Sequence, residues 1–251
     1  MNKIALVTGG SRGLGKEEAI QLAKRGFDVI LTYQSNKTEA DKVVNEIQAL
    51  NKKAAALPLD ISTTHSFDTF ISELRGVLSS VFNAEKIDAL INNAGVGNYS
   101  LYTDTSEEAF DAMVNIHLKA PYFLTQKLLP LIHDGGSVLN TSSGLSRFSY
   151  PGSSAYGIMK AGIEALTRYQ AVELGSRKIR VNTIAPGAIA TDFGGGRVRD
   201  NKELNDAIAS RTALGRVGLA DDIGSVAAFL CSDEAKWINA QRIEVAGGIH
   251  I

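Results

Sequence analysis

The residues with the clearest chemical potential are Tyr156 and Lys160, which are four positions apart in Tyr156-Gly157-Ile158-Met159-Lys160. In a helix this spacing places both side chains on one face. A free phenol has a pKa of about 10, which is too high for efficient proton exchange at neutral pH. A neighbouring ammonium group favours the phenolate, so we expect Lys160 to lower the pKa of Tyr156. The pair therefore predicts acid–base chemistry, although the same spacing is also typical of a tyrosine packed beside an extended lysine.

A glycine-rich turn near the start of the chain could bind phosphate. The segment Thr8-Gly9-Gly10-Ser11-Arg12-Gly13-Leu14-Gly15 follows a short apolar run and precedes a helical pattern. Free N–H groups at the start of a helix favour an anion, and glycines let the backbone approach it closely. The spacing is G-x-x-x-G-x-G, which differs from the common dinucleotide fingerprint G-x-G-x-x-G. The turn predicts a nucleotide site, and a glycine turn that binds nothing is the alternative for this segment alone.

A second motif overlaps the same turn. Residues Gly10 to Lys16 match G-x-x-x-x-G-K, the beginning of a P-loop. A P-loop continues with Ser or Thr, whose hydroxyl ligates Mg²⁺, but this chain continues with Glu17. A carboxylate cannot supply that hydroxyl and would repel the phosphates. A P-loop nucleotide-binding protein is therefore the less favoured alternative.

Short apolar runs alternate with longer helical patterns along the 251 residues, of which 44% are hydrophobic. The predicted strands are 3–7, 28–32, 54–59, 89–92, 137–141, 180–184 and 242–245. Helical patterns include 14–25, 37–50, 66–81 and 154–174. The alternation predicts an α/β fold, a single doubly wound Rossmann-type domain over residues 1–251. We expect a seven-stranded, mainly parallel sheet with helices on both faces.

The end of the second predicted strand indicates which dinucleotide is bound. In NAD-binding sheets an acidic residue near this point accepts hydrogen bonds from the ribose 2′-hydroxyl. Here residues 31–37 contain no acid that would repel a 2′-phosphate. Arg12 could reach the same place and pair with that phosphate. The sequence therefore predicts NADP(H) in preference to NAD(H).

Polar or glycine-rich residues also follow three further predicted strands. Asn92-Asn93-Ala94-Gly95 ends the fourth, Asn140-Thr141-Ser142-Ser143 ends the fifth, and residues 185–191 follow the sixth. Ligands bind at the carboxyl ends of the strands in doubly wound sheets. We therefore expect these segments to share a site with the glycine turn and with Tyr156, thirteen residues after Ser143.

Jointly, in this order and spacing, the motifs resemble those of the short-chain dehydrogenase/reductase family over essentially the whole chain. The resemblance is carried by Thr8, Gly9, Gly13, Gly15, Asp60, Asn92 to Gly95, Asn115, Ser143, Tyr156, Lys160, Pro186 and Gly187. It implies hydride transfer between a nicotinamide and a ketone or aldehyde, with the alcohol formed or consumed. A non-catalytic dinucleotide sensor of the same fold is the alternative, but it would not need Ser143, Tyr156 and Lys160 together.

The resemblance also implies individual roles. Tyr156 would donate a proton to the carbonyl oxygen, Ser143 would hydrogen-bond that oxygen, and Lys160 would also grip the nicotinamide ribose. Asn115 would hold a water in a proton relay. Asp60 would accept from the adenine amino group, and Thr191 with the backbone of Ile189 would orient the carboxamide. The full predicted cofactor site is Gly9, Ser11, Arg12, Gly13, Leu14, Gly15, Gln34, Ser35, Asp60, Ile61, Asn92, Ala94, Gly95, Tyr156, Lys160, Pro186, Gly187, Ile189 and Thr191.

Composition excludes several other classes of function. The net charge is −1, with 26 basic and 27 acidic residues intermingled, which argues against nucleic acid and against a membrane surface. The lone Cys231 cannot form an internal disulfide. The scattered histidines lack the spacing of a helical metal site, and we expect His117 to pack near Asn115. These features predict a cytoplasmic enzyme without a metal.

The substrate is expected to be a small carbonyl compound. Three adjacent glycines at 194–196 predict a hinge, and residues 193–211 a lid over the substrate. Tyr99, Phe148 and Tyr150 are candidates to line its pocket. The chain is similar both to 3-oxoacyl-carrier-protein reductases and to reductases of small ketones, sugars and steroids, so the identity of the substrate stays open. The resemblance also implies a homo-oligomer, usually a tetramer.

Overall fold

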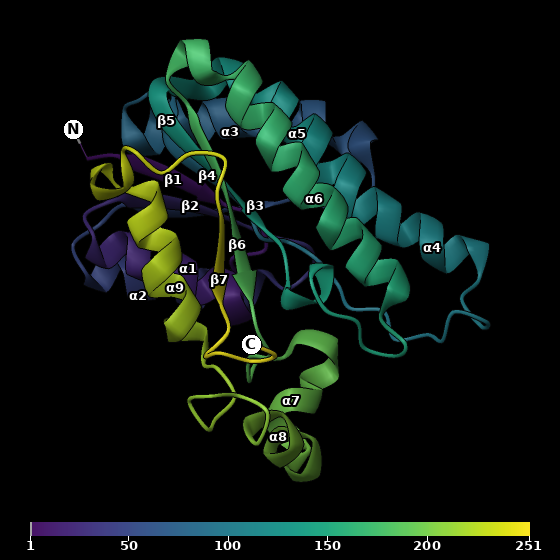
Figure 1. Cartoon of the computed structure of the whole chain (residues 1–251). Helices are drawn as coiled ribbons and strands as arrows, with labels where there is room; N and C mark the ends of the chain where they lie inside the picture. The colour runs from purple at the N-terminus through teal and green to yellow at the C-terminus, as the bar shows by residue number, and fades with distance from the viewer. Residues whose placement is uncertain (1) are drawn as a thin grey trace.

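The seven predicted strands form one sheet in the computed structural model, which describes residues 2–251 (Figure 1). Its order is β3-β2-β1-β4-β5-β6-β7, and every neighbouring pair is parallel. The sheet is therefore wholly parallel rather than mainly parallel. The strands are β1 (Ile4–Val7), β2 (Asp28–Tyr33), β3 (Ala54–Pro58), β4 (Ile87–Asn92), β5 (Ile132–Thr141), β6 (Arg180–Pro186) and β7 (Arg242–Val245).

Helices cover both faces of the sheet, as predicted (Figure 1). One face packs against α1 (Gly13–Lys24), α2 (Lys37–Ala49) and α9 (Ala220–Cys231). The other packs against α3 (Phe67–Val77), α5 (Ala120–Leu128) and α6 (Ser154–Glu173). The strands read as near-continuous apolar runs because both of their faces are buried. No helix in residues 2–251 is long and apolar enough to cross a membrane.

Two helical segments contain π-helical turns, and one of them was predicted from the sequence. The segment 66–81 is α3 followed by a π-helical turn, Leu78–Phe82, which ends at Asn83 with φ +52°. The second π-helical turn, Asn115–Lys119, joins α4 (Glu107–Val114) to α5. Single π-helical turns often occur at functional sites, and the second one contains the predicted residue Asn115.

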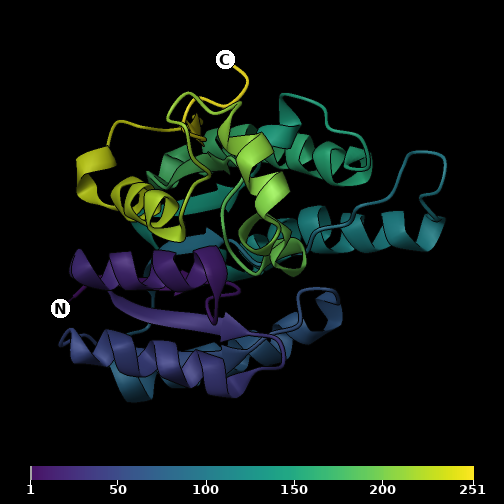
Figure 2. The ribbon, with the colours of Figure 1, turned by 90° about the horizontal axis from the view of Figure 1, so that it is seen from below.

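The segment predicted as a lid leaves the sheet after β6. It begins with a 3-10 turn, Phe193–Gly196, and continues as two short helices, α7 (Arg197–Asp200) and α8 (Lys202–Ala209). Gly194, Gly195 and Gly196 all have positive φ, between +61° and +76°, which explains why three glycines are needed. Both helices lie beyond the end of the sheet towards which β6 points, and Figure 2 shows them from that side.

Helix α1 buries a carboxyl group in the apolar layer that it shares with α9. Glu18 is fully buried, and neither carboxyl oxygen has a hydrogen-bond partner. Burial raises the pKa of Glu18 to about 8, so the side chain is mainly protonated at neutral pH. The buried thiol of Cys231 lies close enough that a charge on Glu18 contributes to its raised pKa, after burial itself. This site should weaken the fold whenever Glu18 ionises.

We predict that Glu18→Met raises the free energy of unfolding at pH 7 by about 1–3 kcal/mol, the usual penalty of a buried polar group without a partner. The folded-state pKa of about 8 lies above the ordinary value of 4.5. The contribution of Glu18 to the free energy of unfolding is therefore fully present below pH 4.5 and is lost as the pH rises through 8. Urea unfolding between pH 4.5 and 9 should show this decline in the native protein and a flatter profile in the variant.

The matched control is Glu73→Met on the exposed surface of α3. It makes the same chemical change where water already solvates the carboxylate, so stability should change by less than about 0.5 kcal/mol. Identical pH profiles for native protein and Glu18→Met would show that Glu18 does not titrate as its burial requires.

Candidate active site

A cavity of about 790 Å³ opens where the carboxyl ends of β1, β4, β5 and β6 meet. The glycine turn forms one wall and the segment 193–211 contributes to another. The predicted site residues that line it are Gly9, Ser11, Arg12, Gly13, Leu14, Gln34, Asp60, Ile61, Ala94, Gly95, Ser143, Tyr156, Lys160, Pro186, Gly187, Ile189 and Thr191. Residues as distant in the sequence as Gly9 and Thr191 thus share one cavity.

The glycine turn is held against the end of β4 by one hydroxyl group. Thr8 Oγ1 accepts hydrogen bonds from the N–H groups of Asn93 and Ala94, both at 3.0 Å, and donates to the carbonyl of Ile91 at 3.1 Å. Gly15 completes the turn, because a Cβ there would lie 2.4 Å from both Gly9 O and Asn93 Nδ2. Only glycine lets the helix begin this close to the strand ends.

The first turn of α1 fits an anionic group. Arg12, its N-cap residue, has extended backbone and makes no side-chain capping bond, and the turn contains no acidic residue. Gly13 and Leu14 line the cavity, so backbone N–H groups are available there for a pyrophosphate. Lys16 pairs instead with Glu46 at 2.7 Å and is not part of the cavity wall. This arrangement does not support the P-loop alternative, since the lysine of a P-loop must reach the phosphates.

The far end of the cavity has the polar groups expected for the adenosine half of a dinucleotide. Asp60 Oδ1 accepts from the N–H of Ser62 at 2.9 Å and lies 3.5 Å from Gln34 Nε2. Arg12 is exposed and also lines the cavity. These residues fit a dinucleotide, with an uncapped helix N-terminus between the adenosine end and Tyr156.

Tyr156 and Ser143 meet at the inner end of the cavity. Ser143 follows β5 in extended conformation, and its Oγ accepts from the N–H of Leu145 at 3.2 Å. Burial, and then the charge of Tyr99, raises the pKa of Tyr156 above its ordinary value, whereas a hydrogen bond with Ser143 lowers it. The expectation that Lys160 lowers this pKa is not met, because the desolvation of the phenol is the larger effect.

Lys160 is buried one helical turn after Tyr156. Its Nζ donates to the carbonyl of Thr141 at 2.7 Å and lies 5.4 Å from the centroid of the Tyr156 ring. Burial lowers the pKa of Lys160 to about 7. Its ammonium form is therefore only about half populated at neutral pH, which is a second reason why it does not depress the pKa of Tyr156.

Four predicted site residues lie outside the wall of this cavity. Gly15 packs inside the turn, and Ser35 lies on the exposed loop after β2. The Asn92 amide donates to Thr125 Oγ1 at 3.0 Å and to Asn140 Oδ1 at 2.8 Å, so it joins β4 to β5 and α5. Asn115 begins the π-helical turn, and its two successors line the cavity in its place.

His117, which was expected only to pack near Asn115, lies beside Tyr156 and lines the cavity. The two rings make an edge-to-face contact with centroids 5.2 Å apart, and His117 Nε2 lies 2.8 Å from the Val96 carbonyl. Burial, followed by the charge of Lys160, lowers the pKa of His117 to about 3. The His117 ring is therefore neutral at neutral pH. Its place in the sequence, two residues after the predicted site residue Asn115, was the signal that could have identified it as a site residue. His117 and Lys160 also line a second, small cavity of about 20 Å³.

Aromatic side chains line the outer part of the main cavity, as proposed for Tyr99, Phe148 and Tyr150. Phe193 joins them, with its ring centroid 6.0 Å from that of Tyr156. Arg197 lies over the Tyr99 ring at 4.8 Å, so α7 contacts the loop that follows β4. Residues 2–251 contain no cluster of three or more side chains able to hold a metal ion.

Comparisons with known proteins agree with this geometry. Residues 9–250 match the family described as enoyl-(acyl carrier protein) reductase. The chain is 36% identical over 253 residues to a 3-oxoacyl-[acyl-carrier-protein] reductase of Staphylococcus epidermidis, with full coverage of both proteins.

Solved structures extend the comparison to ketoreductases. The reductase LugOII, which catalyses keto-reduction during lugdunomycin biosynthesis, superposes with a TM-score of 0.94 at 34% identity, covering 99% of this chain and 98% of that one. The angucycline C-6 ketoreductase LanV, solved with bound NADP, gives 0.93 at 33% identity, covering 98% and 95%. The chain therefore belongs to the short-chain dehydrogenase/reductase family and is an oxidoreductase that acts on the C=O/CH–OH pair.

Proposed function

We propose that this protein is an NADP(H)-dependent reductase of a small ketone or aldehyde, with Tyr156 as the general acid. The observation that carries the proposal is the common cavity of Ser143, Tyr156 and Lys160 with an uncapped helix N-terminus suited to pyrophosphate. When bound, NADPH would supply the hydride. Every other step is assigned to side chains of this chain.

Tyr156 and Ser143 would act on the substrate oxygen. Because its pKa is raised, Tyr156 keeps its hydroxyl proton at neutral pH. It would donate this proton to the carbonyl oxygen of the substrate as negative charge develops there. Ser143 donates a hydrogen bond to the same oxygen. Lys160 in its ammonium form, favoured below pH 7, stabilises the phenolate that remains. We also propose that Asn115, on the π-helical turn, holds a water that returns the proton.

The cofactor preference is assigned to Arg12 and the end of β2. Gln34 follows β2, where an acidic residue would repel a 2′-phosphate, and the exposed Arg12 lines the same cavity. A guanidinium matches phosphate oxygens in two-pronged geometry. These features favour NADP(H) over NAD(H).

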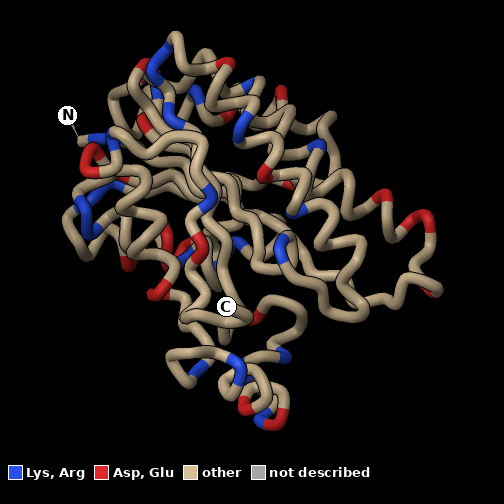
Figure 3. Tube along the Cα trace, viewed as in Figure 1, with Lys and Arg blue, Asp and Glu red and all other residues tan. Residues whose placement is uncertain are grey.

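The charges around the lid favour a small molecule over a carrier protein. An acyl-carrier-protein substrate is acidic and would need unpaired cations near the mouth of the cavity. Arg199 is paired with Asp192 and Asp200, and Lys202 with Asp206. Of the two other cations of the segment, Arg197 lies over the Tyr99 ring and Arg211 lines the cavity, so the segment offers mixed charge and no continuous basic patch. Figure 3 accordingly shows both signs of charge on α7 and α8. The aromatic wall and the segment 193–211 are proposed to close over a free carbonyl compound.

Tyr156→Phe should lower kcat for carbonyl reduction by about 10²–10⁴-fold, the usual contribution of a general acid. The Kd for NADPH should stay within about twofold, because the ring and its packing remain. Activity is followed by NADPH oxidation with a panel of ketones, and binding by NADPH fluorescence. The control is Tyr102→Phe, a tyrosine that is 85% exposed and outside the cavity wall, which should have no effect. A native protein that binds NADPH but reduces no carbonyl would instead be a non-catalytic dinucleotide sensor.

Arg12→Ala should weaken NADPH binding about 10-fold, equivalent to about 1.4 kcal/mol of lost phosphate contact, and leave NADH binding unchanged. Lys16→Ala is the matched control, since Lys16 is a nearby cation already paired with Glu46 outside the cavity wall. Equal losses of NADPH and NADH affinity in Arg12→Ala would remove the role of Arg12 in choosing the cofactor.

The chain is further proposed to form a homo-oligomer, a tetramer by resemblance. Ile158, Tyr169 and Val172 are 55%, 70% and 79% exposed along α6, and Tyr122 on the neighbouring α5 is 48% exposed. An apolar stripe of this kind is typical of a protein interface. Light scattering should give a multiple of the 26.8 kDa chain mass, and Val172→Glu should reduce it. A native protein that is monomeric at micromolar concentration would refute the proposal.

A further inference from the structure

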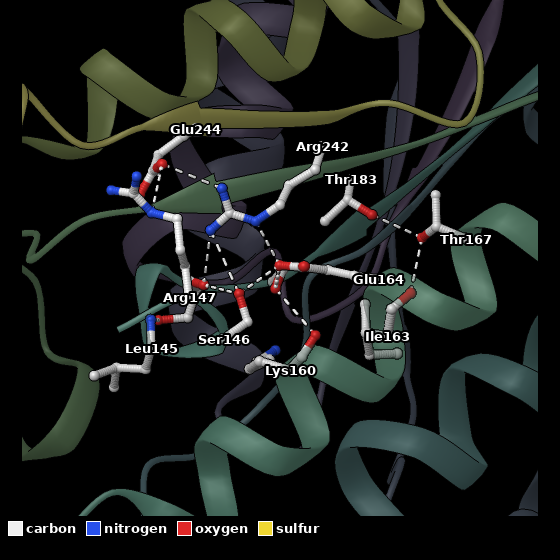
Figure 4. Close-up of polar contacts among 12 residues, drawn as sticks. Leu145, Ser146, Arg147, Lys160, Ile163, Glu164, Thr167, Thr183, Arg242 and Glu244 are labelled. Carbon is white, nitrogen blue, oxygen red and sulfur yellow. Dashed lines mark hydrogen bonds and ion pairs between the residues drawn. The ribbon is translucent and has the colours of Figure 1, made fainter. Parts of the chain in front are cut away.

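A connected polar network joins Glu164 of α6 to Ser146 and to Arg242 of β7 (Figure 4), none of which lines the cavity. Its centre is Glu164, which follows Tyr156 and Lys160 at four-residue intervals on α6. A single carboxylate oxygen, Glu164 Oε1, lies 2.7 Å from Ser142 Oγ, 2.5 Å from Ser146 Oγ and 2.6 Å from Arg242 Nε. Three donors from two different segments therefore converge on one acceptor.

Arg242 brings the last strand, β7, into the network. Besides its bond to Glu164, its Nη2 donates to the Ser143 carbonyl at 3.3 Å and lies 3.4 Å from Ser146 Oγ. Its Nη1 donates to Glu244 Oε2 at 3.2 Å. A guanidinium is planar and rigid, so these bonds fix the direction of the Ser143 backbone relative to Glu164.

The network also contacts the backbone of Lys160. Ser142 Oγ lies 3.1 Å from the carbonyl of Lys160, in addition to its contact with Glu164. The Glu164 and Arg242 side chains are only 16% and 23% exposed. An ion pair this shielded from water is stronger than the exposed pairs elsewhere on the surface, and losing one partner leaves the other poorly solvated.

We propose that Glu164 and Arg242 form a positioning pair that holds Ser143 at the correct distance from Tyr156 and Lys160. Neither residue lines the cavity, so neither would touch substrate or cofactor. The inference rests on the proposed function, because it assigns the catalytic work to the three residues that the pair holds. It adds two residues, 78 positions apart, to the groups on which the reaction depends.

The pair would act through the backbone of residues 142–146. Ser143 is close enough to Tyr156 to lower the pKa of the phenol, and the Ser143 carbonyl accepts a hydrogen bond from Arg242. Without the pair, residues 142–146 lose their side-chain bonds to Glu164 and Arg242. They keep the contact of Ser142 Oγ with the Lys160 carbonyl and the bond of the Ser142 N–H to the Ile184 carbonyl, so the Ser143 hydroxyl is held less firmly relative to α6. A displacement of about 1 Å at a reacting group can cost about 10²-fold in rate.

The test compares Glu164→Ala, Arg242→Ala, the double variant and Glu164→Gln. Each alanine variant should lower kcat for ketone reduction about 10- to 100-fold, with the Kd for NADPH within about twofold of native. The double variant should be no slower than the slower single variant, because both remove one interaction. Glu164→Gln keeps an acceptor oxygen for Ser142 and Ser146 and should recover part of the rate.

Arg177→Ala is the matched control. Arg177 also ties several segments together, donating to the carbonyls of Leu129 and Ile132 and to Asp134, but at the opposite end of β5. It should lower the melting temperature about as much as Arg242→Ala while leaving kcat unchanged. Equal kcat values for native protein, Glu164→Ala and Arg242→Ala would overturn the inference and reduce the pair to a structural contact.

Hydrogen exchange supplies a readout that needs no turnover. The amides of residues 142–147 should exchange faster in Glu164→Ala and Arg242→Ala than in the native protein, and not in Arg177→Ala. Unchanged exchange there would also overturn the inference. If the native protein reduces no ketone, the proposed function fails, yet the exchange measurement still decides whether the pair holds this segment.

Discussion

The parallel order of the strands is the constraint on which the rest of the structure depends. Because every strand points the same way, the carboxyl ends of β1, β4, β5 and β6 meet at one edge of the sheet. The chain moves outwards to β2 and β3 on one side of β1 and resumes with β4 on the other. The crevice at this change of direction is where doubly wound sheets bind ligands, and the large cavity lies there.

Desolvation at the inner end of that cavity explains the state of its ionisable groups. Burial raises the pKa of Tyr156, lowers that of Lys160 to about 7 and lowers that of His117 to about 3. All three groups are thus driven towards their neutral forms. A neutral phenol retains the proton that carbonyl reduction consumes, and a lysine that titrates near pH 7 can gain its charge when an anion forms beside it.

Rigidity and openness are divided between two sides of the cavity. The inner side is tied to α6 and β7 by the ion pair of Glu164 and Arg242 and by the hydroxyls of Ser142 and Ser146. The outer side rests on three consecutive glycines with positive φ and on two short helices whose charges pair mainly among themselves. Catalytic groups need fixed geometry, whereas substrate entry needs a segment that can move.

The sequence by itself determined the strand and helix order, the glycine turn and the shared helix face of Tyr156 and Lys160, because each depends on neighbouring residues. It also located most of the cavity wall through the strand ends. Only the tertiary structure decided that Asn92 hydrogen-bonds Asn140 on the neighbouring strand instead of lining the large cavity. It also decided that Lys16 pairs with Glu46 and that His117 contacts Tyr156. The tertiary structure likewise decided that Glu164 pairs with Arg242 and how burial changes the pKa values of the site residues. These depend on packing between segments distant in the chain, which local spacing does not specify.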